Sequence, residues 1–117
     1  MPLSSPTPVF IPAPAGKQTL TITGATTSGV NGTLRYAGSN AGKVAWSTDG
    51  TLTPGSSNVI MQYNGTQWVL SLGSTYSATK TSGADDPVGL ATWTLGTGTG
   101  QPTVAAGSVA APPIITA

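Results

Sequence analysis

The fold of this chain is decided by the stretch NVIMQYNGTQWVLSL, residues 58–72. Apolar and polar side chains alternate on both sides of Asn64-Gly65, and alternation with a period of two is typical of a half-buried β-strand. Asn-Gly is strongly preferred in two-residue type I′ turns, because both central residues of that turn need a positive φ. The stretch therefore predicts a β-hairpin with its turn at Asn64-Gly65.

A two-residue turn at these positions also predicts the strand register. Tyr63 should lie opposite Thr66, and Met61 opposite Trp68. One face of the hairpin then carries large side chains and should belong to the core: Val59, Met61, Tyr63, Trp68, Leu70 and Leu72. The other face is more polar, with Ile60, Gln62, Gln67, Val69 and Ser71.

The same alternation continues on both sides of this hairpin. It is present at residues 19–23, around the Gly/Asn-rich turn at 38–42, and at residues 90–95, where Trp93 and Leu95 alternate with threonines. No stretch shows a helical stripe of useful length. We therefore predict an all-β fold, a small antiparallel sandwich or barrel of about six to eight strands.

Proline is concentrated at the two ends of the chain, at positions 2, 6, 8, 12 and 14 and at 102, 112 and 113. Proline has no N–H donor and restrains the residue before it, so these ends should be extended rather than helical. The predicted organisation is an extended arm at 1–16, an antiparallel β-domain at 17–100 and a second extended arm at 101–117. Small apolar clusters punctuate the arms at Val9-Phe10-Ile11 and Ile114-Ile115.

The chain is poor in the side chains that carry out catalysis. It has 117 residues with no histidine, cysteine or glutamate, and only four cations and three aspartates. General acid–base chemistry needs a group with a pKa near the working pH, and a nucleophilic Ser or Thr needs a neighbouring base. We therefore expect a protein that is not an enzyme and that uses no cofactor.

Charge and hydropathy exclude other classes of partner. The four scattered cations and a net charge of +1 do not form the basic face that nucleic acid requires. No apolar run approaches the length of a membrane span. The first residues have neither the basic nor the apolar region of a secretion signal, so an extracellular location would need another route, such as lysis of a phage-infected cell.

Several candidate sites have a structural alternative. The rings of Trp46, Trp68 and Trp93 could stack on sugars, but a domain this small needs them in its core. Tyr76 is the freer ring, because residues 74–83 resemble a loop. A calcium site at Asp85-Asp86 with Asp49 is disfavoured, since two adjacent carboxylates before proline more often cap a turn. The glycine-rich run 96–100 is expected to be a flexible exit into the C-terminal arm.

A wider pattern joins Val30-Asn31-Gly32-Thr33-Leu34-Arg35-Tyr36 and Gly42-Lys43 with Trp46, the run 63–70 and Trp93. It resembles a small Gly/Trp-rich β-module of bacteriophage virion proteins and of bacterial surface or secreted proteins. Leu34 stands where that module usually has an aromatic residue, and Ala41 where it usually has asparagine. The resemblance implies no catalytic residues.

These observations together predict a structural component of a phage virion, most simply a capsid decoration (cement) protein that attaches through its arms. Its partners would be copies of itself or a major virion protein. The predicted partner-binding residues are the apolar arm positions Val9, Phe10, Ile11, Ile114 and Ile115. Two alternatives remain open, a tail-fibre or receptor-binding component that meets a glycan and a secreted carbohydrate-binding module.

Overall fold

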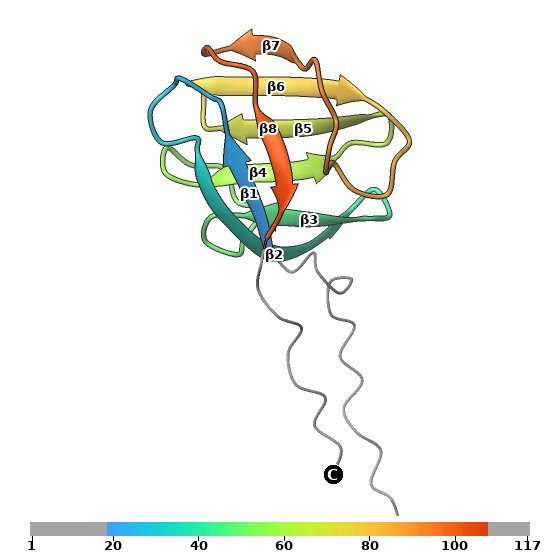
Figure 1. Ribbon diagram of the computed structural model, residues 1–117. Helices are drawn as coiled ribbons and strands as arrows, with labels where there is room; N and C mark the ends of the chain where they lie inside the picture. Colours follow the sequence, from blue (N-terminus) through green and yellow to red (C-terminus); the bar gives the residue numbers. More distant parts are fainter. Residues whose placement is uncertain (1–18, 108–117) are drawn as a thin grey trace, which may run out of the picture.

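The computed structural model describes residues 19–107, and this part of the chain is all-β (Figure 1). It contains eight strands: β1 (Thr19–Thr23), β2 (Gly32–Asn40), β3 (Lys43–Ser47), β4 (Val59–Tyr63), β5 (Gln67–Leu72), β6 (Tyr76–Thr81), β7 (Thr94–Thr97) and β8 (Thr103–Ala106). No helix is present among the described residues. The predicted all-β class and strand number are confirmed. The predicted arm at 1–16 and residues 108–117 of the second arm lie outside the described residues.

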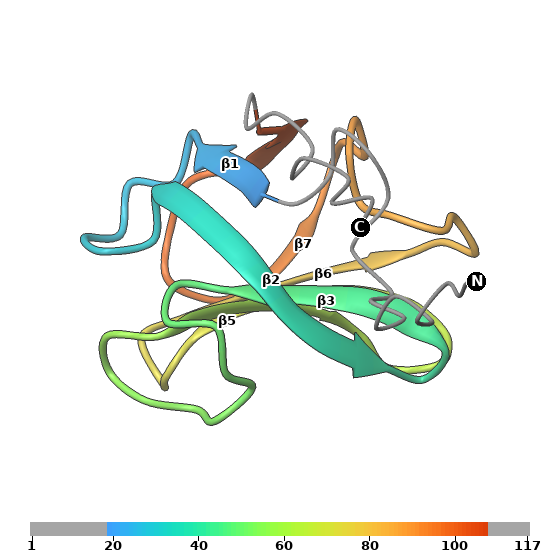
Figure 2. The same cartoon turned by 90° about the horizontal axis from the view of Figure 1, so that it is seen from below.

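All eight strands belong to one antiparallel sheet in the order β7-β6-β5-β4-β3-β2-β1-β8. The sheet curls into a half-barrel, and the long strand β2 runs from the side of β1 to the layer formed by β3–β6 (Figure 2). Its first half pairs with β1 up to Arg35, and its second half pairs only with β3. The curl brings the chain from β7, at one end of the sheet, directly to β8 at the other.

The core fills the inner face of this curled sheet. Strand β5 shows the period-two burial that the sequence predicts, with Trp68, Leu70 and Leu72 buried and the intervening residues half-buried. The main cluster contains Leu20, Ile22, Ala25, Val30, Leu34, Trp46, Val59, Met61, Tyr63, Trp68, Leu70, Leu72, Tyr76, Ala78, Trp93 and Val104. The predicted core face of the hairpin is therefore confirmed in full.

The predicted register of this hairpin is wrong by two residues. Met61 lies opposite Leu70, and Tyr63 lies opposite Trp68. The turn is centred one residue later, on Gly65-Thr66, and only Gly65 has a positive φ (107°), which is the sign pattern of a type II′ turn. The Asn64 side chain stabilises this turn, because its Oδ1 accepts the N–H of Gln67 at 2.8 Å. A shift of two residues keeps every side chain on its predicted face.

The type I′ turn occurs instead between β2 and β3. Asn40 pairs with Lys43, and the two central residues, Ala41 (φ 51°) and Gly42 (φ 84°), both have positive φ. Alanine is strained in this conformation, since a Cβ approaches the following carbonyl. The signal at Asn64-Gly65 therefore identified a hairpin correctly but not its turn type.

Three further expectations about the second half of the chain are corrected. Tyr76 is fully buried at the start of β6 rather than in a free loop. The last strand before the C-terminal segment begins at Thr94, and residues 90–93 precede it as a loop. Residues 103–106, which the sequence placed in the C-terminal arm, form β8 and pair with β1. Proline content alone could not reveal that this short strand completes the sheet.

Candidate assembly surface

The two ends of the described chain lie side by side. β1 and β8 are antiparallel neighbours, and the Gly107 N–H donates a hydrogen bond of 2.8 Å to the Thr19 carbonyl. A Cβ on Gly107 would collide with the Thr19 hydroxyl, so glycine permits this close approach. The segments before Thr19 and after Gly107 therefore both start from the same end of the same strand pair.

The residues predicted to bind partners fall outside the described part of the chain. Val9, Phe10 and Ile11 precede Thr19, and Ile114 and Ile115 follow Gly107. Their predicted role stays a prediction. The structure adds the position from which both segments depart, which sequence reasoning could not supply because it depends on the pairing of β1 with β8.

The gap between β7 and β8 is closed by side-chain and loop contacts instead of a strand pair. Gln101 acts as an amide clamp: the Trp93 N–H donates to Gln101 Oε1 at 2.8 Å, and Gln101 Nε2 donates to the Trp93 carbonyl at 2.7 Å. The Gly89 N–H adds a bond of 3.1 Å to the Val104 carbonyl. The segment after β6 is thus held along the outer side of β8.

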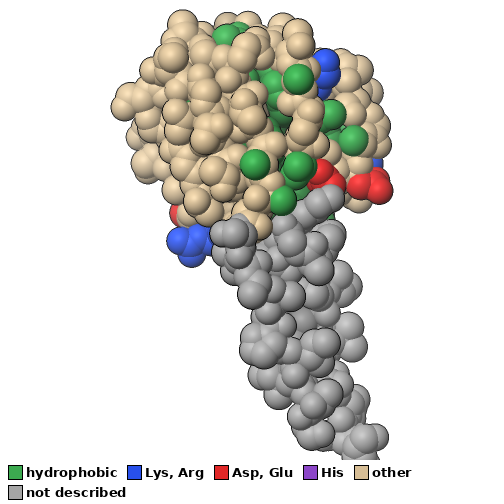
Figure 3. Space-filling view, in the orientation of Figure 1, with side chains coloured by type: hydrophobic (Ala, Val, Ile, Leu, Met, Phe, Trp, Pro, Cys, Tyr) green, Lys and Arg blue, Asp and Glu red, His purple; other side chains and the backbone are tan. Residues whose placement is uncertain are grey.

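A shallow cavity of about 350 Å³ lies where these two segments meet, lined by Gly89, Leu90, Ala91, Thr92, Gln101, Pro102 and Thr103. None of these residues carries a charge. Hydrophobic side chains gather along this crevice beside β8 (Figure 3). We call the surface formed by residues 89–92 and 101–103 the β8 groove. No short-range sequence signal indicated it, since its two walls are about ten residues apart and meet only because the sheet curls.

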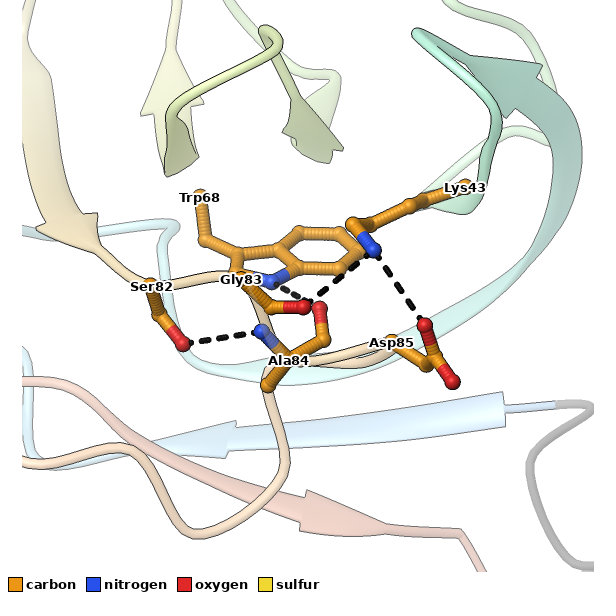
Figure 4. Close-up of polar contacts among 6 residues, drawn as sticks. All are labelled: Lys43, Trp68, Ser82, Gly83, Ala84 and Asp85. Carbon is orange, nitrogen blue, oxygen red and sulfur yellow. Dashed lines mark hydrogen bonds and ion pairs between the residues drawn. The ribbon is translucent and has the colours of Figure 1, made fainter.

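A second cluster fastens the segment that follows β6 onto the central hairpin (Figure 4). Lys43 Nζ lies 3.2 Å from Asp85 Oδ1 and 4.9 Å from the centroid of the Tyr63 ring. The indole N–H of Trp68 donates to the Ala84 carbonyl at 3.1 Å. The Asp85 side chain is fully exposed, so its ion pair contributes little to stability, and we assign this cluster a structural role.

The large rings do not form a surface row among the described residues. Trp46, Trp68, Trp93 and Tyr76 are all buried, which confirms the core assignment of the tryptophans. Trp68 packs against Trp46 and Tyr63 at centroid distances of 6.2 and 5.3 Å. Tyr36 is the one large apolar side chain in residues 19–107 that is exposed, at 39%. A single ring offers little area for stacking on a glycan chain.

Asp49 and Asp86 each accept hydrogen bonds within their own turn, whereas Asp85 pairs with Lys43. Thr51 donates to Asp49 Oδ1 from both its hydroxyl and its N–H, each at 2.8 Å, and the first of these bonds does most to lower the pKa of Asp49. The Val88 N–H donates to Asp86 Oδ1 at 3.0 Å, as expected for a carboxylate that caps a turn before proline. Across residues 19–107 no three metal-ligating side chains lie together.

The glycine-rich run 96–100 is not a loose exit from the domain. The Tyr76 hydroxyl donates to the Gly100 carbonyl at 2.7 Å, and burial raises the pKa of this phenol. The Thr26 N–H donates to the Thr99 carbonyl at 2.9 Å. These bonds attach the segment that connects β7 to β8 to Tyr76 and to the loop that follows β1. The expectation that this run is flexible is therefore corrected.

Comparison with known protein families, with curated proteins and with solved structures finds no match for this chain. Within the described part of the chain, no helix has the length and apolar character needed to span a membrane. The fold and the surfaces described above are therefore the basis for a functional proposal.

Proposed function

We propose that this protein is a non-enzymatic structural component of a phage virion, a capsid decoration protein that attaches through its two arms. The observation that carries the proposal is the bond between Gly107 and Thr19, which starts both arms from one end of the β1–β8 pair. Two arms with a common origin can contact neighbouring subunits while the β-domain stays on one side of them.

The residue types in the chain support a structural role rather than a catalytic one. The sequence lacks His, Cys and Glu, and the described carboxylates are occupied by turn contacts or by Lys43. The Gln101 side chain stabilises the domain through its two hydrogen bonds with the backbone of Trp93. The β-domain itself offers a stable body, and the arms supply the apolar residues that can bury surface on a neighbour.

The alternative roles in glycan binding have less support. Both a receptor-binding fibre component and a carbohydrate-binding module would use exposed rings to stack on sugars. The described domain presents only Tyr36 in this way, whereas the other large rings are in the core. We therefore place the attachment chemistry in the arms.

The proposal is tested on the particles released from cells that carry the gene. We expect this chain to co-purify with those particles in a density gradient at a fixed copy number, as measured by mass spectrometry. A variant lacking residues 2–14 should keep the tryptophan fluorescence and melting temperature of the β-domain but no longer sediment with particles.

A full-length variant in which Val9, Phe10 and Ile11 are replaced by serine is the matched control for arm length. It should also fail to attach, because the apolar contacts and not the length of the arm provide the affinity. Absence of the chain from purified particles, or normal attachment of the truncated variant, would contradict the proposed function.

A further inference from the structure

The tripeptide Asn-Gly-Thr occurs twice in the chain, at residues 31–33 and at residues 64–66. An asparagine before glycine can lose its side-chain amide without an enzyme, because glycine has no side chain to shield its backbone nitrogen from the asparagine Cγ. Both asparagines are exposed. Since the reacting residues are the same in the two copies, a difference in their reactivity should come from the fold.

The reaction, deamidation, has two steps and needs only water as a co-reactant. In the first step the glycine nitrogen attacks the asparagine Cγ, and the new N–Cγ bond closes a succinimide ring. The side-chain nitrogen leaves as ammonia and takes the proton that the glycine nitrogen gives up. In the second step water adds to one of the two ring carbonyls and breaks its bond to the ring nitrogen, which regains a proton. The product is aspartate or isoaspartate.

The attacking nitrogen is held in the first copy and open in the second. Gly32 lies in β2 and pairs with Ile22 of β1. The Thr19 carbonyl accepts the Gly107 N–H, so the backbone groups of Thr19 face β8. By alternation those of Ile22 face β2, and the Gly32 N–H is part of the β1–β2 ladder. Gly65 lies in the turn between β4 and β5, and no described residue accepts a hydrogen bond from its N–H.

The leaving nitrogen differs between the copies in the same way. Asn31 Nδ2 donates to the Ala25 carbonyl at 2.8 Å, while Asn31 Oδ1 accepts the Ala25 N–H at 3.1 Å. Loss of ammonia would therefore take away the donor of the Ala25 carbonyl. Asn64 Nδ2 donates to no residue within the described part of the chain, so its departure breaks no contact there.

The side-chain oxygen of Asn64 lies among donors that stabilise the attack. Oδ1 accepts the Gln67 N–H at 2.8 Å, the Thr66 N–H at 3.0 Å and the Thr66 hydroxyl at 3.3 Å. This oxygen gains negative charge as the glycine nitrogen adds to Cγ, and donors directed at such an oxygen lower the barrier. Asn31 Oδ1 has the Ala25 N–H alone as its described donor.

The product also suits the second copy better than the first. An aspartate at position 64 keeps its acceptor oxygens, and the hydrogen bonds from Thr66 and Gln67 become charge-assisted and therefore stronger. An aspartate at position 31 has no donor for the Ala25 carbonyl and places a carboxylate against it. The turn between β4 and β5 thus tolerates the change that the loop after β1 does not.

We propose that Asn64 is a site of spontaneous deamidation in the folded protein and that the fold protects Asn31 from the same reaction. The new aspartate adds a negative charge at the tip of the β4–β5 hairpin and removes the formal net charge of +1. The charge of the domain therefore changes with its age. This inference does not rest on the proposed function, because the reaction needs only the folded chain and water.

The rates are tested on the purified full-length protein in mildly alkaline buffer. Samples are digested at acidic pH, where the reaction is slow, and the conversion of each asparagine is measured by peptide mapping with mass spectrometry. Asn64 should convert at least about tenfold faster than Asn31, because attack at Asn31 must first break two hydrogen bonds that each slow it several-fold. In urea, which removes the fold and keeps the sequence, both asparagines should convert at similar rates.

Two variants test whether the turn tolerates the product. Asn64→Asp should keep the melting temperature of the parent protein, because the hydrogen bonds to Oδ1 remain. Asn31→Asp, the matched change in the other tripeptide, should lower the melting temperature by several degrees, because the bond to the Ala25 carbonyl is lost.

Two results in the folded protein would overturn the proposal: conversion of Asn31 as fast as that of Asn64, or no conversion at Asn64 while the unfolded chain reacts. A rate difference that persists in urea would also overturn it, since the neighbouring sequence and not the fold would then set the rates. If Asn64→Asp destabilises the protein as much as Asn31→Asp does, the turn does not tolerate the product.

Discussion

Substitution of Gly100 by alanine tests whether the crossing from β7 to β8 is packed as the structure shows. Gly100 has a φ of +92°. A Cβ built on it would collide with the backbone nitrogen of Thr26 and would lie 2.6 Å from the Gly24 carbonyl oxygen and 2.8 Å from the Ala25 carbonyl carbon. All three neighbours are backbone atoms, so no side chain can rotate away to make room. The loop after β1 would have to move.

The expected cost has two parts that a control variant separates. A non-glycine residue with a φ in this range is strained by about 1–2 kcal/mol, partly offset by about 0.4–1 kcal/mol from the lower entropy of the unfolded chain. Forcing a methyl group into packed atoms adds about 1–3 kcal/mol. Gly42 has a similar φ of +84° and nothing within 4 Å of its Cβ position, so Gly42→Ala carries only the first part.

We expect Gly100→Ala to lower the free energy of unfolding by about 2 kcal/mol more than Gly42→Ala does. The assay is equilibrium urea unfolding, followed by the fluorescence of the buried tryptophans. In a domain of this size the difference corresponds to a drop in melting temperature of about 4–8 °C per kcal/mol. Equal costs for the two variants would show that residues 98–100 do not pack on the loop after β1, and would refute the described closure of the sheet.

Four further outcomes follow from the same contacts. Trp68→Ala should cost about 3–5 kcal/mol in urea unfolding, because the ring is fully buried, and a cost below about 1 kcal/mol would contradict its place in the core. Ala41→Gly should stabilise the protein by about 1 kcal/mol by relieving a positive φ, seen as a higher urea midpoint, whereas an unchanged or lower midpoint would argue against the type I′ turn. Burial raises the pKa of Tyr76, so the contribution of this residue to stability is complete below the ordinary tyrosine pKa and is lost as pH rises through the raised value. Above about pH 10 the parent protein should therefore lose stability that the Tyr76→Phe variant retains, and parallel stability profiles of the two proteins would contradict this. Bonds from the Thr51 hydroxyl and N–H lower the pKa of Asp49, so the contribution of this carboxylate to stability is present above the ordinary aspartate pKa and is lost as pH falls through the lowered value. The Asp49→Asn variant should therefore show a flatter dependence of stability on pH below about pH 4, and an unchanged slope would count against these bonds.

In the central hairpin, the local sequence pattern predicted which face each side chain lies on but not the strand register. The alternation of residues 58–72 assigned the six residues of the core face correctly, because the period of a strand is two. Ile60, which the pattern placed on the more polar face, is also buried. The predicted register is wrong because the Asn-Gly preference makes Asn64 a central residue of the turn. In the structure Asn64 flanks the turn and its side-chain oxygen accepts backbone N–H groups. A side chain thus competed with the backbone geometry that the Asn-Gly pair favours.

For the candidate assembly surface, the sequence predicted the types of residue involved but not their positions in the fold. The sequence showed that the ends are rich in proline and carry apolar clusters, and that the chain is poor in catalytic groups. The common origin of the arms joins Thr19 and Gly107, which are far apart in the chain, and the β8 groove joins two segments that lie on either side of β7. These pairings arise only when the whole sheet curls.

The sequence by itself determined the all-β class, the core face of the central hairpin and the poverty in catalytic side chains, since each follows from composition or from a period of two. Tertiary structure alone decided that residues 103–106 complete the sheet, that Gly100 is tightly packed and that Tyr76 is buried. The physical reason is the range of the interactions. Alternation and turn preferences act between near neighbours, whereas closure depends on contacts such as that of Tyr76 with Gly100, which no local pattern encodes.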